Sequence, residues 1–233
     1  MRILFSLLVG LMLPMVVSAA PRFNDVTKGS GIKVGNRAHA VAVEDFNGDG
    51  HLDFIVACFD APHVQLFLGD GKLHFTEGTK GSGLESFAGA GTGMAVGDYD
   101  RDGKLDVYIA SLRAGASRLF RGLGGGKFAD VSRKTGTLVK SACRSCSFSD
   151  VDGDGWLDLF VTAPLGPNHL FSNRRNGTFT DIAARAGLAM ADRQNLGSAF
   201  GDIDGDGRWE VALGEALDRL PLLPARLAIA KIS

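Results

Sequence analysis

The chain has 233 residues, 45% of them hydrophobic and 22% charged, which is enough for one domain or a small pair. Its formal net charge is −1, and its basic residues are scattered rather than clustered, which argues against a nucleic-acid-binding surface. The cysteine count of three is odd, which argues against a disulfide framework.

Residues 1–20 have the features of a secretory signal peptide. Arg2 supplies a positive charge, an apolar run follows, and residues 18–20 are the small residues that a signal peptidase requires. The apolar run is short for a membrane span, which needs roughly 20 apolar residues, and no second run of that length follows. We therefore expect a secreted protein, extracellular or held in the periplasm or at the cell surface, with no membrane span after cleavage.

An Asp-rich segment of nine residues is repeated along the rest of the chain. It reads D-F-N-G-D-G-H-L-D at 45–53 and recurs with few changes at 98–106, 150–158 and 202–210, so successive copies begin 53, 52 and 52 residues apart. A second motif, Phe-x-Asp or Phe-x-Glu, keeps the same spacing, with its phenylalanine at positions 23, 75, 128 and 179. Self-similarity near 50 residues is typical of a propeller or a solenoid.

Each repeat reads as four short strands. Small and apolar residues precede each Asp-rich loop, which predicts strands at 38–43, 91–96, 143–148 and 196–200. An apolar run follows each loop, which predicts strands covered on both faces at 54–57, 107–110, 159–162 and 211–213. A Leu-Phe strand and the Phe-x-Asp strand complete the unit, with Gly-rich turns between them. Four short strands with such turns form a propeller blade.

We therefore predict an all-β protein, with a β-propeller region of about four blades over residues 21–214 and an atypical tail at 215–233. The Leu-Phe hairpin expected after residue 214 is missing, and the tail offers no good third strand. Two architectures fit: an incomplete propeller, or a four-bladed ring in which residues 23–27 supply the last outer strand. An incomplete ring would leave unpaired blade edges through which chains could associate.

The Asp-rich loops have the ligand pattern of calcium sites. Ca²⁺ takes six to eight oxygen ligands from carboxylates, carbonyls and water, whereas Mg²⁺ demands tighter octahedral geometry. Loop positions one, three and five can point toward one centre, position seven can offer its backbone carbonyl, and position nine closes the shell. We predict up to four Ca²⁺ sites, with Asn47 weakening the first. The predicted ligands are Asp45, Asn47, Asp49, His51 and Asp53; Asp98, Asp100, Asp102, Lys104 and Asp106; Asp150, Asp152, Asp154, Trp156 and Asp158; and Asp202, Asp204, Asp206, Arg208 and Glu210.

Charge supports a cation in the loops. The four loops hold fifteen of the 26 acidic residues and three of the 25 basic ones, so they carry −12 while the remainder carries +11. Carboxylates this close repel one another unless a cation or protons neutralise them. An EF-hand is excluded because position twelve is apolar in every copy, where an EF-hand needs a bidentate Glu. The alternative is that these segments are solvated turns, which Asp and Gly also favour.

The pair Cys143 and Cys146 forms a C-x-x-C sequence. The repeat alignment places both on one strand, where residues three apart point to opposite faces, roughly 10 Å apart and too far for a disulfide. A zinc site would need a second Cys or His pair at matching spacing, and the sequence has none. We interpret both as small buried residues.

In these motifs the chain resembles the FG-GAP/VCBS repeat family, which forms the blades of integrin α-subunit propellers and of many secreted bacterial proteins. The Phe-x-Asp-Val and D-x-D-x-D-G-x-L-D combination is especially similar to secreted ASPIC/UnbV-type proteins. The resemblance covers residues 23–214. It implies a calcium-binding loop between the first and second strands of each blade, seven blades in a complete propeller, and a recognition or adhesion module.

The resulting hypothesis is a non-enzymatic module that recognises an unknown extracellular protein or glycan. Two alternatives stay open: a propeller-type hydrolase or lyase with its site in the central channel, and a truncated fragment without independent function. The sequence contains no G-x-S-x-G, no H-E-x-x-H and no phosphate-binding loop.

Overall fold

The computed structural model describes residues 23–35, 37–192, 194–216 and 226–231. Fifteen strands in this part of the chain form four antiparallel sheets, which we call blades one to four. The first blade contains β1 (Ala38–Glu44), β2 (Asp53–Cys58), β3 (Val64–Gly69) and β4 (Phe75–Glu77), and the second contains β5 (Gly91–Gly97), β6 (Asp106–Ser111), β7 (Arg118–Gly124) and β8 (Lys127–Asp130). The third contains β9 (Ser145–Ser149), β10 (Asp158–Thr162), β11 (His169–Asn173) and β12 (Phe179–Asp181), and the fourth contains β13 (Gln194–Gly201), β14 (Glu210–Ala216) and β15 (Arg226–Lys231).

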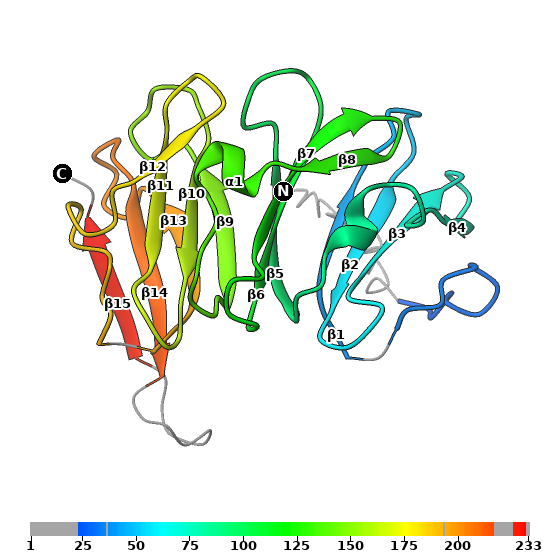
Figure 1. The fold of residues 1–233 in the computed structure, drawn as a ribbon, viewed down its shortest axis with the longest axis horizontal. Coiled ribbons are helices and arrows are strands. Elements are labelled where there is room, and N and C mark those ends of the chain that lie inside the picture. Colours follow the sequence, from blue (N-terminus) through cyan, green and yellow to red (C-terminus); the bar gives the residue numbers. More distant parts are fainter. Residues whose placement is uncertain (1–22, 36, 193, 217–225, 232–233) are drawn as a thin grey trace, which may run out of the picture.

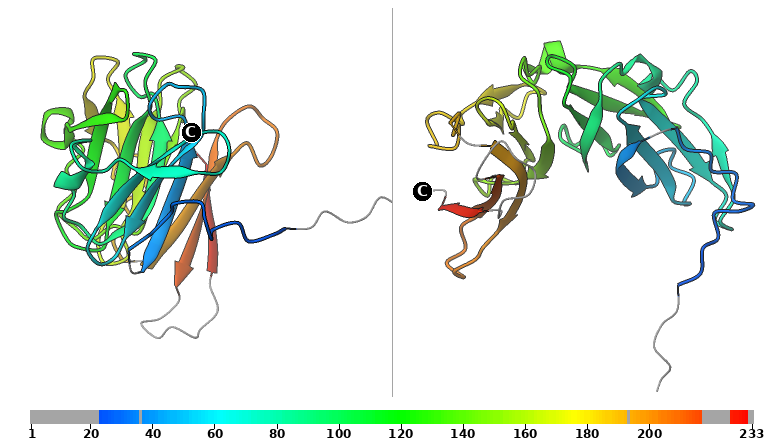
Figure 2. Two further views of the ribbon diagram at one scale, coloured as in Figure 1. Left: turned by 90° about the vertical axis from the view of Figure 1, so that its right-hand side faces the viewer. Right: turned by 90° about the horizontal axis from the view of Figure 1, so that it is seen from below.

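The blades stand side by side in an open arc (Figures 1 and 2). Their innermost strands β1, β5, β9 and β13 contact one another in sequence order. The arc does not close, which confirms the incomplete propeller, and the four-bladed ring is wrong for this structure. The motif at 23–27 forms no strand, and Phe23 is 96% exposed, so this segment does not complete the last blade.

Each inner blade is covered on both faces, which explains the continuous apolar runs of the second strands. In β6, Val107 and Ile109 pack against the first blade, while Tyr108 and Ala110 pack against the third. All four side chains are fully buried. The period-2 alternation of a strand therefore divides one apolar run between two different interfaces.

The two ends of the arc expose side chains at positions that the inner blades cover. Val41 and Val43 of β1 are 61% and 41% exposed, whereas Phe148, which aligns with Val43, packs into the core between blades two and three. Ile203 is 56% exposed, whereas the aligned Tyr99 is 2% exposed beneath the third blade. Position in the arc, rather than the local sequence, decides whether these residues are covered.

A connecting segment lies between successive blades and carries the only helical turns among the described residues, η1 (Leu84–Ser86) and α1 (Ser132–Thr135). The carbonyl of Ser82 accepts a hydrogen bond from the backbone N–H of Phe128, which lies on the outer strand of the next blade, β8. Gly83 lies against the same strand with φ +95°, and a Cβ there would stand 2.1 Å from the Phe128 carbonyl oxygen. Only glycine fits this position.

Two sequence expectations are corrected. The tail does supply a third strand, because β15 pairs with β14 along six residue pairs. Cys143 precedes β9 instead of lying on it, so both Cys143 and Cys146 pack into one core cluster rather than on opposite faces. Both are buried and free, as interpreted from the sequence.

The predicted leader, residues 1–20, lies outside the described residues. Within the residues described, the structure contains no helix with the length and apolar character of a membrane span.

Candidate metal centres

Each Asp-rich loop connects the first and second strands of its blade, as the family resemblance implies. The segments 45–53, 98–106, 150–158 and 202–210 join β1 to β2, β5 to β6, β9 to β10 and β13 to β14. The repeated topology therefore places the four loops at equivalent positions along the arc.

The carboxylate at position one folds the loop around itself. Asp45 accepts hydrogen bonds from the backbone N–H groups of Gly48, Asp49 and Gly50, at 2.7, 3.1 and 2.8 Å. The residues at position one of the other loops, Asp98, Asp150 and Asp202, accept the equivalent bonds from positions five and six. The glycine at position six has a φ between +82° and +86° in every copy, a conformation that favours glycine.

The acid at position nine is buried and ties the loop to the sheet. Asp106 is fully buried, and its Oδ2 accepts the N–H of Tyr99 at 3.0 Å while its Oδ1 accepts the N–H of Gly122 at 2.8 Å. Asp53 and Asp158 make the same two kinds of bond. Glu210, 4% exposed, accepts the N–H of Ile203 at 2.8 Å.

Burial of these closing acids changes their acidity. Desolvation raises the pKa of Asp106 to about 7 and that of Asp158 to about 6, against the opposing effect of the backbone N–H groups that hydrogen-bond them. Neighbouring loop carboxylates, Asp100 and Asp98 for the first of them, raise the pKa further. A cation in the loop would act in the opposite direction and favour the ionised form.

The structure brings three sets of predicted ligands together. Carboxylate oxygens lie within 4.8 Å of one another in each of three sets: Asp98, Asp100 and Asp106; Asp150, Asp152 and Asp154; and Asp202, Asp204 and Asp206. In the first loop, the side-chain amide of Asn47 donates a hydrogen bond to Oδ2 of Asp49 at 2.9 Å. This bond occupies a carboxylate oxygen of Asp49 that would stay available to a cation if position three were an Asp.

The donor set fits a hard divalent cation. Oδ1 of Asp100 is buried and makes no hydrogen bond in the described structure, although it belongs to the acid cluster of the second loop. A buried carboxylate oxygen without a partner is costly. Several carboxylate oxygens around one point are the ligands that calcium or magnesium takes, whereas soft transition metals favour sulfur and imidazole.

Position seven contributes to the loop through its backbone. The N–H groups of His51, Lys104, Trp156 and Arg208 each donate to the carboxylate at position five of their own loop. The side chains at this position have other partners in two loops. Lys104 pairs with Asp102 at 2.9 Å, and the Trp156 ring lies 5.0 Å from the Arg101 guanidinium. The carbonyl role of position seven stays a prediction.

Sequence reasoning missed two arginines that hold the loop acids. Arg121, on β7, bonds Asp100 through Nε at 2.5 Å and Asp102 through Nη2 at 2.6 Å. Arg175, in the turn between β11 and β12, bonds Asp154 through Nη2 at 2.6 Å. Arg121 directly follows the Leu-Phe pair of the third strand, but the other two pairs are followed by Leu68 and Ser172, so the repeat gave no signal for an arginine at this position.

A family model described as an FG-GAP-like repeat matches residues 45–109, 102–161 and 150–213, and each match begins at or within one of these loops. The chain belongs to the FG-GAP-like repeat family. The matches confirm the resemblance inferred from the repeated motifs.

Three relatives illustrate this membership. Cartilage acidic protein 1 of Mus musculus is 31% identical over 138 residues, which cover 54% of this chain and 21% of the relative. The Xenopus tropicalis protein of the same name is 28% identical over 215 residues, covering 86% of this chain and 31% of the relative. Integrin alpha-PS3 of Drosophila melanogaster is 28% identical over 146 residues, covering 54% and 13%. The chain thus spans less than a third of the length of each.

Proposed function

We propose that this protein works outside the cell as a calcium-binding recognition module without catalytic activity. The observation that carries the proposal is the recurrence, in all four loops, of one arrangement: an acid at position one that folds the turn, and a buried acid at position nine. In three loops the acids also converge within 4.8 Å.

In this proposal Ca²⁺ is held by the acids and amide at loop positions one, three, five and nine, with the carbonyl at position seven. The ion neutralises carboxylates that repel one another and that burial makes hard to ionise. Because the closing acid also accepts hydrogen bonds from the loop and from the third strand, calcium would stiffen each blade where it meets its neighbour. Tyr99, in the second loop, contacts Phe179 of the third blade with ring centroids 5.4 Å apart.

The extracellular location rests on two observations. The sequence predicts a leader at residues 1–20, and the relatives carry names that refer to cartilage and to an integrin. The partner we propose is an extracellular protein or glycan that binds along the arc. For the alternative, an enzyme with its site in a central channel, the four sheets form an open arc (Figure 2), so the described residues do not by themselves enclose such a channel.

Calorimetric titration of the chelator-treated protein with CaCl₂ tests the proposal. We expect saturable binding of more than one and at most four ions, with one ion lost in each of the variants Asp98→Asn and Asp150→Asn. Asparagine keeps an acceptor for the loop N–H groups but removes the charge. Asp192→Asn, an exposed acid outside the loops, is the matched control and should change nothing. Absence of binding at millimolar calcium by a folded protein would contradict the proposal.

A further inference from the structure

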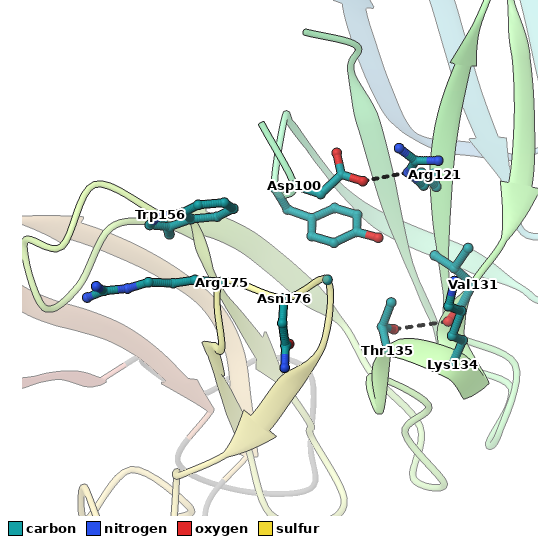
Figure 3. Close-up of a pocket in the computed structure, with 10 residues that line it drawn as sticks. Asp100, Arg121, Val131, Lys134, Thr135, Trp156, Arg175 and Asn176 are labelled. Carbon is teal, nitrogen blue, oxygen red and sulfur yellow. Dashed lines mark hydrogen bonds and ion pairs between the residues drawn. The ribbon is translucent and has the colours of Figure 1, made fainter. Parts of the chain in front are cut away.

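A cavity of about 390 Å³ lies between the second and third blades (Figure 3). Its walls come from separate elements: Tyr99 and Asp100 of the second loop, Arg121 of β7, Lys134 of α1, Trp156 of the third loop, and the turn that carries Arg175 and Asn176. In Figure 3 the Asp100–Arg121 pair lies on one side of the cavity and Trp156, Arg175 and Asn176 lie on the other.

The charged and amide groups that remain available in this cavity are hydrogen-bond donors, and the Tyr99 hydroxyl can donate as well as accept. Oδ1 of Asn176 already accepts two bonds, from the N–H and the hydroxyl of Thr178, which leaves its NH₂ group to donate. The hydroxyl of Thr135 is bonded to Val131 and Thr137. Lys134 is exposed, and no ion pair joins it to another described residue.

The single acid in the wall is not available as an acceptor. Oδ2 of Asp100 is held by Arg121 at 2.5 Å, and its Oδ1 is buried. Arg101 adds a further positive charge over the Trp156 ring. A ligand that fits must therefore bring negative charge and several acceptor groups. An acidic protein side chain supplies only two oxygens, whereas an acidic sugar can present its charged group and its hydroxyls to different walls.

The cavity shares charges with the candidate metal loops. Arg121 bridges Asp100 and Asp102, and Arg175 pairs with Asp154. A divalent cation bound by these carboxylates would reduce the negative charge that holds the two guanidinium groups. The cavity would then present a stronger positive potential to an anion, and by linkage an anion in the cavity would strengthen cation binding by the same factor.

We propose that this cavity binds an acidic sugar, through its carboxylate or sulfate group, and that calcium in the second and third loops tightens this binding. The calcium dependence rests on the function proposed above, while the sugar site itself rests on the donors of the cavity.

Titration calorimetry of the full chain tests the proposal with three probes: glucuronic acid, N-acetylglucosamine 6-sulfate and uncharged N-acetylglucosamine. The first two distinguish a carboxylate from a sulfate source. We expect at least one anionic sugar to bind tenfold or more tightly than the neutral sugar. Its affinity should fall at least threefold when calcium is replaced by chelator.

The decisive variant is Lys134→Glu, which reverses a charge in the cavity wall outside the acidic clusters. We expect it to weaken sugar binding at least tenfold and to leave the number of bound calcium ions unchanged. Lys140→Glu, an exposed lysine on the same connecting segment, is the matched control and should retain wild-type sugar affinity.

Three results would overturn the inference while leaving calcium binding intact: no anionic sugar binds to the calcium-loaded protein, Lys140→Glu weakens binding as much as Lys134→Glu, or an Asp-containing tripeptide binds more tightly than either sugar. Equal sugar affinity with and without calcium would overturn the coupling. Failure of the calcium titration itself would instead contradict the function proposed in the preceding subsection.

Discussion

The second and fourth loops have nearly the same sequence pattern but different surroundings. In the second loop Asp98 and Asp100 are partly buried and Tyr99 is 2% exposed, because the third blade covers them. In the fourth loop Asp202, Asp204 and Asp206 are exposed and Ile203 is 56% exposed.

The hydrogen bonds that fold the two loops are nevertheless shared. Asp98 and Asp202 both accept N–H groups from positions five and six, and Asp106 and Glu210 both accept the N–H of position two. The motif alone therefore determines the turn, while the neighbouring blade determines how far the charges of the loop are desolvated.

The largest expected difference concerns loop position two. Tyr99→Ala removes a buried ring at the interface of blades two and three and should lower the free energy of unfolding by about 3–5 kcal/mol. Ile203→Ala shortens an exposed side chain and should change the free energy of unfolding by less than about 0.5 kcal/mol. Urea unfolding measures both, and equal losses would show that the neighbouring blade does not distinguish the two loops.

The next effect concerns the closing acid. Asp106→Ala leaves the N–H groups of Tyr99 and Gly122 buried without an acceptor, at about 1–3 kcal/mol each. Removing a desolvated charge offsets part of this cost. We therefore expect the free energy of unfolding in chelator to fall by about 2 kcal/mol. Asp204→Ala, in the exposed fourth loop, is the comparison and should cost less than about 0.5 kcal/mol. The account of loop closure fails if the two variants unfold at the same urea concentration.

The pH dependence of the calcium-free protein tests the burial of the closing acids. The folded-state pKa values of about 7 for Asp106 and about 6 for Asp158 lie above the unfolded value of an Asp, so the folded state binds more protons between about pH 4 and pH 7. The stabilising contribution of protonation is complete below pH 4 and is lost as the pH rises through 6 and 7.

We therefore expect the free energy of unfolding in chelator to fall from pH 5 to pH 8. The fall should be smaller with saturating calcium, which binds the ionised acids. Stability in chelator that rises across this range would show that the closing acids are not desolvated as the structure indicates.

The smallest expected effect concerns Arg121, which pairs with two acids of the second loop. Arg121→Gln removes a positive charge next to the bound ion and should tighten calcium binding at that loop about tenfold, or about 1.4 kcal/mol. Arg208→Gln in the exposed fourth loop should change affinity less, because solvent screens its charge. Weaker calcium binding by Arg121→Gln would mean that the arginine positions the ligands more than it repels the ion.

Much of this architecture could be predicted from the sequence because its determinants are local. The 52-residue spacing, the Gly at loop position six and the apolar runs after each loop predicted the blades and the converging acids. The strand β15 could not be predicted, because Arg226–Lys231 lacks the Leu-Phe motif and pairs through its backbone with β14. The partners Arg121 and Arg175 depend on a register between strands, and the shared core of Cys143 and Cys146 depends on where β9 begins.

The most direct test of the account is thermal unfolding of the purified protein in excess chelator and in calcium at one hundred times its dissociation constant. Each independent site that binds only the folded state should add about 2.7 kcal/mol, so the account predicts a clear rise in Tm with calcium. The rise should be smaller in the double variant Asp98→Asn/Asp150→Asn. A cooperative transition at the same temperature in both buffers would contradict the claim that the loops are calcium sites built into the fold.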